Sequence, residues 1–310
     1  MDEFELIRRY FDRRNAASGV VVGIGDDGAV LEPTPDKQQV QVIDTLVEGV
    51  HFPAGTHPAD IGYRVVAVNL SDVAAMGAKP RWMTLALTLA GANEQWLQLF
   101  SRGLFEAADQ FDVTLVGGDT TSGTVITVTV TVIAEVEKGG ALLRSGAKAG
   151  DGIYVTGTPG DAAAGLQLLK QGEASGDLQQ RFLRPTAHLE VGNMLVGKAS
   201  AAIDVSDGLV GDLRKLLSAS GVGGEIDIGK LPISGALLDY AGAEAASRFA
   251  LTGGDDYELC FTAADDLIID KIGDIARVTR IGQVLDILQL NCKLDGDIVE
   301  IDDSGYRHFQ

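Results

Sequence analysis

Alternation of apolar and polar residues predicts three strands in the first half of the chain. Residues 39–52, QVQVIDTLVEGVHF, begin with a period of two and predict a strand that ends at Asp44. Residues 82–90, WMTLALTLA, predict a second, more uniformly apolar strand. Residues 124–136, TVITVTVTVIAEV, alternate Thr with apolar side chains. This last pattern indicates a strand with one buried face and one face that is polar or covered by a partner.

Residues 64–81, RVVAVNLSDVAAMGAKPR, predict a buried helix, because Val, Ala and Leu occupy most of its sides. Asn69 and Asp72 interrupt this pattern three residues apart, which places them on one face. Gly77 and Pro80 are typical signals for the end of a helix. A carboxylate on such a helix loses its hydration unless it has a partner. A basic residue, a neighbouring loop or a metal ion would each satisfy it.

Helical spacing and glycine-rich turns account for the segments between these elements. Residues 93–111 predict an amphipathic helix with Asn93 as its N-cap. Residues 113–123 predict a strand that runs into a Gly-Gly turn containing Asp119. Residues 20–31, VVVGIGDDGAVL, predict a strand, a tight acidic turn and a second strand.

The three glycine-containing turns of residues 138–151 predict a boundary between two domains. We therefore expect an N-terminal domain at 1–138 and a C-terminal domain at 139–310. The C-terminal half predicts strands and helices in a mixed order. It includes a polar surface connection at 170–180 and a helix at 183–199 that is entered through Pro185.

Composition narrows the classes of function. A chain of 310 residues with 45% apolar and 22% charged residues is typical of a folded globular protein. The net charge of −19 argues against nucleic acid or an anionic membrane as a partner. Two cysteines without CxxC spacing argue against a disulfide framework or a zinc site. The charged N-terminal helix is unlike a signal peptide and no apolar run could span a membrane, so we expect a cytoplasmic protein.

Acidic residues at predicted strand ends carry the chemistry. Besides the helical Asp72, they are Asp27, Asp44, Asp119, Asp204, Asp207 and Asp255. Each one alone is most simply a polar turn. Together they predict a cluster of Mg²⁺ ions that would bind phosphate oxygens and relieve the repulsion between carboxylates. The chain lacks a GxxxxGK[ST] loop, a dinucleotide fingerprint and the kinase HRD and DFG motifs, so ATP would need another architecture.

A series of motifs then resembles one family. IGDDGAV, DTLVEGVHF, VNLSDVAAMGAKPR, VGGDTTSG, IDVSDGL and GGDDYELCF are similar to motifs of the thiamine-monophosphate kinases, and the resemblance runs from Phe4 to Phe309. It implies the aminoimidazole ribonucleotide synthetase-like fold, with an α/β N-terminal domain and an α+β C-terminal domain. It further implies a homodimer whose N-terminal domains close a β-barrel through residues 124–133.

The resemblance implies transfer of the ATP γ-phosphoryl group to thiamine monophosphate, with Mg²⁺ and possibly K⁺. The implied metal ligands are Asp27, Val42, Ile43, Asp44, Asp72, Asp119, Asp204 and Asp207. The implied ATP contacts are Gly118, Asp119, Arg144 and Ser206. The implied contacts with thiamine monophosphate are His51, Asp255 and Tyr306. Asp44, Asp119 and Arg144 would be the catalytic residues.

Two positions depart from the family pattern. Val42 and Ile43 replace the usual Ser-Thr, so a metal there could use only a backbone carbonyl. Asp255 replaces the usual Glu and is one methylene shorter. Three other functions remain open from the residues: another ATP-using enzyme of the same superfamily, a Mg²⁺-dependent phosphohydrolase, and a nucleotide-binding regulator without catalysis.

Overall fold

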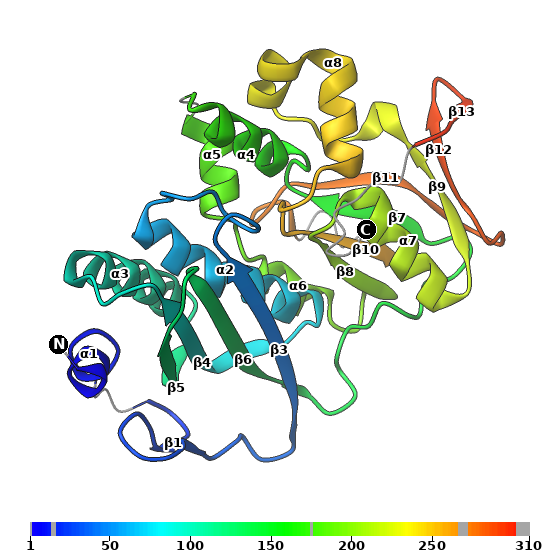
Figure 1. The fold of residues 1–310 in the computed structure, drawn as a ribbon. Helices are drawn as coiled ribbons and strands as arrows, with labels where there is room; N and C mark the ends of the chain where they lie inside the picture. Colours follow the sequence, from blue (N-terminus) through cyan, green and yellow to red (C-terminus); the bar gives the residue numbers. More distant parts are fainter. Residues whose placement is uncertain (1, 14–16, 174–175, 266–271, 302–310) are drawn as a thin grey trace. The chain divides into compact units, whose positions relative to one another are not determined.

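The computed structural model describes residues 2–13, 17–173, 176–265 and 272–301, and Figure 1 shows its elements. Contacts within the chain divide it into two compact units. Unit 1 comprises Met1–Val73 and Ala78–Gly139, and unit 2 comprises Ala74–Gly77 and Gly140–Gln310. The last residues of one helix, 74 and 75, therefore belong to the second unit.

Unit 1 is built on a four-stranded sheet with the order β3-β6-β4-β5. Its helices are α1 (Glu3–Tyr10), α2 (Pro58–Ala75) and α3 (Glu94–Gln110), and its strands are β1 (Val20–Val22), β2 (Val30–Leu31), β3 (Lys37–Val47), β4 (Lys79–Leu89), β5 (Thr114–Ser122) and β6 (Thr127–Glu137). β4 and β5 are parallel and are joined through α3, whereas β6 is antiparallel to both β3 and β4. β1 and β2 form a separate antiparallel hairpin, as their sequence predicts.

The alternating pattern of residues 124–136 is confirmed. Val128, Val130 and Val132 are fully buried on one face of β6, whereas Thr129 and Thr131 on the other face are half-buried. The hydroxyls of Thr45 and Thr129 lie 2.8 Å apart across β3 and β6 on that second face. We call this second face, opposite the buried valines, the outer face of the sheet; it carries Ile43, Thr45, Ala86, Asp119, Thr129 and Thr131.

Helices α2 and α3 pack closely within unit 1 (Figure 1). A Cβ atom added at Gly62 of α2 would lie 2.2 Å from the carbonyl oxygen of Phe100 in α3, so only glycine allows this approach. The predicted N-cap is confirmed, because Asn93 Oδ1 accepts a hydrogen bond of 3.0 Å from the N–H of Trp96. Trp82 of β4 is buried, and its indole N–H donates to the carbonyl of Ser18 at 3.2 Å.

Two predicted strand ends are wrong. β3 continues past Asp44 to Val47, and β5 runs straight through Gly118 and Asp119 instead of turning there. The reason at β5 is tertiary: a Cβ at Gly118 would lie 1.9 Å from the carbonyl oxygen of Leu85. Glycine is therefore needed for the close approach of β4, and it does not mark a turn.

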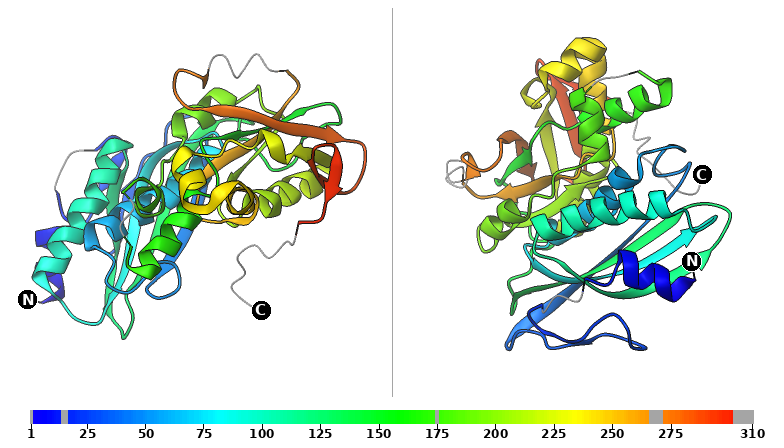
Figure 2. Two further views of the ribbon diagram at one scale, coloured as in Figure 1. Left: turned by 90° about the horizontal axis from the view of Figure 1, so that it is seen from above. Right: turned by 90° about the vertical axis from the view of Figure 1, so that its left-hand side faces the viewer.

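Unit 2 contains a seven-stranded sheet with the order β13-β12-β9-β11-β7-β10-β8. Its strands are β7 (Gly152–Thr156), β8 (Ala201–Val205), β9 (Gly223–Asp227), β10 (Glu258–Ala263), β11 (Val278–Leu285), β12 (Leu290–Leu294) and β13 (Asp297–Val299), and its helices are α4 (Asp161–Gln171), α5 (Gly176–Leu183), α6 (Leu189–Leu195), α7 (Leu209–Ser220), the 3₁₀ turn η1 (Ile228–Lys230) and α8 (Gly235–Thr252). Figure 2 shows these elements from two further directions. The α/β and α+β classes predicted for the two halves agree with this architecture.

Strands β7, β8 and β10 are buried along their whole length, because helices cover both faces of this part of the sheet. On one face, Ile153 and Ile203 pack with Leu213 of α7. On the other face, Tyr154 and Phe261 pack with residues of α6. These strands, at the β8 end of the sheet, therefore carry much of the apolar core of unit 2.

Two sequence predictions in unit 2 need correction. The segment predicted as a polar connection includes the helix α5 from Gly176, which buries Leu178 and Phe182. The helix predicted to begin at Pro185 begins at Leu189, with His188 at its N-cap. Residues 184–188 are thus a connecting segment.

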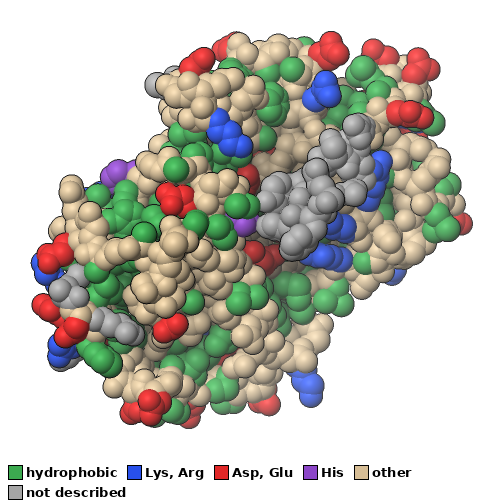
Figure 3. All heavy atoms as spheres, viewed as in Figure 1, with side chains coloured by type: hydrophobic (Ala, Val, Ile, Leu, Met, Phe, Trp, Pro, Cys, Tyr) green, Lys and Arg blue, Asp and Glu red, His purple; other side chains and the backbone are tan. Residues whose placement is uncertain are grey.

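Two general features of the described residues agree with the composition. None of their helices is long and apolar enough to cross a membrane. Acidic side chains are spread over the face drawn in Figure 3, as the charge of −19 requires.

Candidate active site

Two of the predicted acidic residues meet inside unit 1. Asp44 of β3 points toward the helices, because its neighbour across the ladder is the buried Val130. There it is hydrogen-bonded to the half-buried Asp72 of α2 and lies within the field of the buried Arg64. Burial raises the pKa of Asp44, and the contacts with Asp72 and Arg64 offset only part of that shift. We call Asp44 and Asp72 the acidic pair of unit 1.

Asp119 lies elsewhere on the same sheet. Its neighbour across β4 and β5 is Ala86, and the neighbour of Ala86 on β6 is Thr129, so Asp119 is on the outer face. Asp44 is on the opposite face and three strands away. With strands about 4.8 Å apart, the two backbones are separated by about 14 Å across the sheet. Within one protomer, Asp44 and Asp119 therefore do not share a metal ion.

Val42 and Ile43 lie inside β3, an edge strand of the sheet. Successive carbonyls of a strand point in opposite directions, so one of these two carbonyls points away from β6. That one is the carbonyl that could contact a ligand. Ile43 is 65% exposed on the outer face.

Asp27 and His51 lie at the ends of strands in unit 1. Asp27 is exposed in the turn between β1 and β2, where its N–H donates to Asp26 Oδ1 at 2.8 Å. His51 follows β3, and its Nδ1 accepts a hydrogen bond of 3.0 Å from the N–H of Val47. A neutral His51 held in this way carries its proton on Nε2, which orients the ring.

Arg144 lies in the segment before β7, and Ser220 fixes the backbone there. The hydroxyl of Ser220, the last residue of α7, donates to the carbonyl of Arg144 at 3.1 Å. The hydroxyl oxygen of Ser220 also accepts hydrogen bonds from the N–H groups of Gly146 and Ala147, both at 3.1 Å. The guanidinium of Arg144 is exposed. Its backbone is thus fixed while its side chain can reach a phosphate.

Ser206 and Asp207 form the turn between β8 and α7. The N–H groups of both donate to Oδ2 of the buried Asp212 at 2.9 Å, so Asp212 shapes this turn. Lys215 Nζ lies 2.6 Å from Asp207 and 2.8 Å from Asp212, and both carboxylates raise the pKa of Lys215 against the effect of burial. A cation of the protein therefore already compensates Asp207, which weakens its prediction as a metal ligand. The sequence reasoning missed Asp212 and Lys215, although their i, i+3 spacing was readable.

Asp204 and Asp255 lie beside this turn. Asp204 is buried at the second-last position of β8, in agreement with its predicted place at the end of a strand. The N–H of Asp255 donates to the carbonyl of Ser206 at 2.8 Å, so a predicted substrate contact and a predicted ATP contact are adjacent. Asp255 has a φ of +68°, which few residues other than glycine adopt. The third predicted substrate contact, Tyr306, lies outside the described residues.

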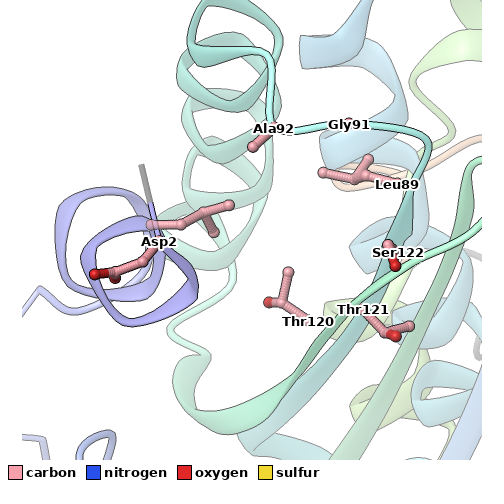
Figure 4. Close-up of a pocket in the computed structure, with 8 residues that line it drawn as sticks. Asp2, Leu89, Gly91, Ala92, Thr120, Thr121 and Ser122 are labelled. Carbon is pink, nitrogen blue, oxygen red and sulfur yellow. The ribbon is translucent and has the colours of Figure 1, made fainter.

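Figure 4 shows a pocket in unit 1 that is separate from these groups. Its lining consists of Asp2, Leu6, Leu89, Gly91, Ala92, Thr120, Thr121 and Ser122. None of the predicted site residues lines it. The lining combines two leucines, three hydroxyl residues, a glycine, an alanine and Asp2, and it contains no cation to hold a phosphate.

Across the described residues, no group of three or more His, Cys, Asp or Glu side chains is arranged to hold a metal ion. Asp44 and Asp72 still fit Mg²⁺ as a pair. They are carboxylates joined by a hydrogen bond, and burial outweighs the effect of Arg64 on the pKa of Asp44. Mg²⁺ often takes only one or two carboxylates from a protein. Water and a substrate phosphate would complete such a site.

Comparison with known families agrees with this two-unit architecture. The family described as "AIR synthase related protein, N-terminal domain" matches residues 25–136. The family described as "AIR synthase related protein, C-terminal domain" matches residues 148–286.

Full-length relatives extend the comparison. The chain is 48% identical to the thiamine-monophosphate kinase of Salmonella typhimurium, over 99% of this chain and 98% of that protein. It is 46% identical to the same enzyme of Escherichia coli K12, with the same coverage.

Solved structures agree as well. A crystal structure of thiamine-monophosphate kinase from Stenotrophomonas maltophilia K279a matches with a TM-score of 0.89 and 44% identity, over 96% of this chain and 98% of that one. A structure described as AaThiL complexed with AMPPCP and TMP matches with a TM-score of 0.80 and 35% identity, over 92% of each chain. The hydrogenase maturation protein HypE of E. coli shares the fold at 19% identity and a TM-score of 0.81. This chain therefore belongs to the thiamine-monophosphate kinase family.

Proposed function

We propose that this protein transfers the γ-phosphoryl group of ATP to thiamine monophosphate and so forms thiamine diphosphate. The observation that carries the proposal is 48% identity to a thiamine-monophosphate kinase over almost the whole of both chains. The AaThiL structure adds support, because it is described as a complex with AMPPCP and TMP. We also retain the prediction of a cytoplasmic enzyme.

Asp44 and Asp72 would hold Mg²⁺ in this reaction. The metal ion would supply charge neutralisation for the phosphate oxygens when it is bound. Arg144 would bind the polyphosphate of ATP, since its guanidinium is exposed on a fixed backbone. The acceptor is already an anionic phosphate, so these residues need to position and neutralise charge without removing a proton. A requirement for K⁺ remains a prediction.

Asp119 would join the site from a second protomer. The outer face carries Asp119 together with the 65% exposed Ile43 and the threonines of β6, and a paired sheet would cover these groups. β3, which carries Asp44, and β5, which carries Asp119, are the two edges of the sheet. Pairing of β3 of each protomer with β5 of the other would close the barrel that the resemblance implies, with the outer faces inside it. In a two-fold dimer, each protomer then supplies the same residues to its partner. We propose a homodimer with two sites, each using Asp44 of one protomer and Asp119 of the other.

One assay tests the proposed function. Purified protein is incubated with ATP, Mg²⁺ and thiamine monophosphate, and thiamine diphosphate and ADP are measured by chromatography. We expect equal amounts of both products. Formation of ADP and inorganic phosphate without thiamine diphosphate would indicate a phosphohydrolase instead. Turnover of ATP with another phosphorylated acceptor, but not with thiamine monophosphate, would indicate a different enzyme of the superfamily.

A further inference from the structure

Glu258 is a fully buried carboxylate at the first position of β10, three residues after Asp255. Its Oε2 atom accepts from the Thr156 hydroxyl at 2.5 Å and lies 2.6 Å from His188 Nε2. Its Oε1 atom accepts from the guanidinium of Arg181. We call Glu258, Thr156, His188 and Arg181 the Glu258 cluster. No step of the proposed reaction uses it.

The Glu258 cluster is closely packed. A Cβ at Gly157 would lie 2.0 Å from Glu258 Oε1, so this side of the carboxylate has room only for glycine. Thr156 Oγ1 also accepts from the N–H of Leu259 at 2.8 Å, which ties β7 to β10 beside the carboxylate. Burial by itself would raise the pKa of Glu258, but His188, Arg181 and the Thr156 hydroxyl lower it to about 2. Glu258 is therefore ionised and has little freedom to move.

The three residues before Glu258 have an unusual backbone. Asp255 has a φ of +68° and Tyr257 a φ of +55°, and a tyrosine in this region is strained. Such strain persists only where the surrounding structure fixes the chain, and it occurs often at functional sites. The N–H of Tyr257 donates to the carbonyl of Val205 at 2.8 Å. The carboxylate of Asp256, between the two strained residues, accepts from the N–H of Gly160 at 2.7 Å and of Ala162 at 3.2 Å.

Residues 255–257 are thus fixed on one side by β8 and on the other by the start of α4. Their C-terminal end is fixed by the Glu258 cluster, which draws on β7, α5 and the N-cap of α6. Asp256 is buried, whereas Asp255 and Tyr257 are half-buried, with the Tyr257 hydroxyl 3.4 Å from Asp255 Oδ1. Asp255 is therefore the carboxylate of this segment that a substrate could reach. The Glu258 cluster therefore ties the end of this segment to three other elements of unit 2. It is suited to holding one side chain in a defined place.

We propose that Glu258 is a positioning residue for the acceptor: together with Arg181, His188 and Thr156 it holds the strained segment 255–257 so that Asp255 meets thiamine monophosphate. The inference rests on the proposed function, in which Asp255 contacts the acceptor. Asp255 is one methylene shorter than the Glu of the family pattern, so its reach depends on where the backbone is held.

The test compares Glu258→Gln with Asp151→Asn. The first variant keeps the shape of the side chain and removes its charge. The second changes another buried carboxylate of unit 2, whose side chain accepts hydrogen bonds from the N–H of Lys148 and the hydroxyl of Ser200, far along the chain from segment 255–257. Steady-state kinetics are measured for both substrates. Hydrogen exchange of the peptide covering residues 253–259 is measured by mass spectrometry.

For Glu258→Gln we expect the KM for thiamine monophosphate to rise about tenfold, as for other residues that orient a ligand-binding group. The KM for ATP should change less than about twofold, and the amides of Asp255 and Tyr257 should exchange faster. Asp151→Asn should lower thermal stability and leave both KM values and this exchange unchanged. Thr156→Val should shift the KM for thiamine monophosphate in the same direction as Glu258→Gln, by less.

An unchanged KM for thiamine monophosphate in a folded Glu258→Gln protein would overturn the inference. An equal rise for Asp151→Asn would also overturn it, because loss of stability alone would then explain the effect. Failure of the proposed function would give a different result, because the wild-type protein itself would then form no thiamine diphosphate. The variant Asp255→Ala tests whether Asp255 contacts the acceptor independently of Glu258. If it raises this KM and Glu258→Gln does not, Asp255 contacts the acceptor without help from the Glu258 cluster.

Discussion

The acidic pair of unit 1 and the Glu258 cluster of unit 2 both hold a carboxylate close to an arginine, and they differ in charge balance. Asp44 faces a second carboxylate, Asp72, and its pKa is raised by burial. Glu258 faces Arg181 and His188, and its pKa is lowered to about 2 despite complete burial. The partners of Glu258 outweigh the effect of burial on its pKa, whereas those of Asp44 do not. A carboxylate whose partners do not outweigh burial is suited to an external cation, whereas one whose partners do is suited to fixing a backbone.

Loss of the external cation site should have the largest effect. Asp44→Asn should lower kcat by about 10²- to 10³-fold, because charge stabilisation of the transferred phosphoryl group is lost. Asp119→Asn, on the outer face of the sheet, should lower kcat by a similar factor. Circular dichroism should show both variants folded.

A mixture of these two inactive variants sharpens the result. Half of the randomly exchanged dimers would contain one of each, and such a dimer has one intact site, so about a quarter of wild-type activity should return. Subunits are mixed, allowed to exchange and assayed, with each variant alone as the control. No recovery after proven exchange would mean that the two residues do not form one site across the dimer.

Metal binding should stabilise the wild type and not the variant. Burial disfavours an ionised Asp44, so metal-free Asp44→Asn should unfold at the same or a higher temperature than wild type. Mg²⁺ at about a hundredfold excess over its Kd should raise the wild-type Tm by about 5 °C and leave that of Asp44→Asn unchanged. Scanning calorimetry with EDTA and with Mg²⁺ measures both. Asp36→Asn, an exposed site in the same unit, should respond as wild type does.

How much of this was readable in the sequence depends on whether the partners are local. The buried helix with Asp72, the alternation of β6 and the Asn93 cap follow from residues within a few positions of one another. The side of the sheet on which Asp119 lies depends on the register of four strands. The partners of Glu258 are equally distant, since Thr156 is 102 positions away and Arg181 is 77. The one local signal for Glu258 was a charged residue at the start of the apolar run ELCF.

Low pH should lower the stability of unit 2 by protonating Glu258. The pKa of Glu258 is lowered from 4.5 to about 2, so its ionised form stabilises the folded state above about pH 5. That contribution, roughly 3 kcal/mol, should be lost as the pH falls from about 5 to about 2. The difference in urea midpoint between wild type and Glu258→Gln should therefore shrink over this range. Circular dichroism at several pH values measures it, and a difference independent of pH would contradict an ionised Glu258.

Ser220→Ala should have the smallest effect. It removes the hydroxyl that links Arg144, Gly146 and Ala147, and costs about 1 kcal/mol of stability. If this backbone orients Arg144 toward ATP, the KM for ATP should rise a few-fold while that for thiamine monophosphate stays constant. Ser218→Ala, two positions earlier on an exposed part of α7, is the control. A change confined to the other substrate would remove Arg144 from the ATP site.

The burial of Trp82 under the chain at Ser18 has a spectroscopic consequence. The chain contains two tryptophans, and both Trp82 and Trp96 belong to unit 1. Trp96 stacks on Phe100, with ring centroids 4.9 Å apart, so each indole reports on packing around the first sheet. Intrinsic fluorescence excited at the indole band therefore follows the loosening of unit 1 alone. Recorded beside far-ultraviolet dichroism, it can show whether the half that carries Asp44 melts together with the half that carries Glu258.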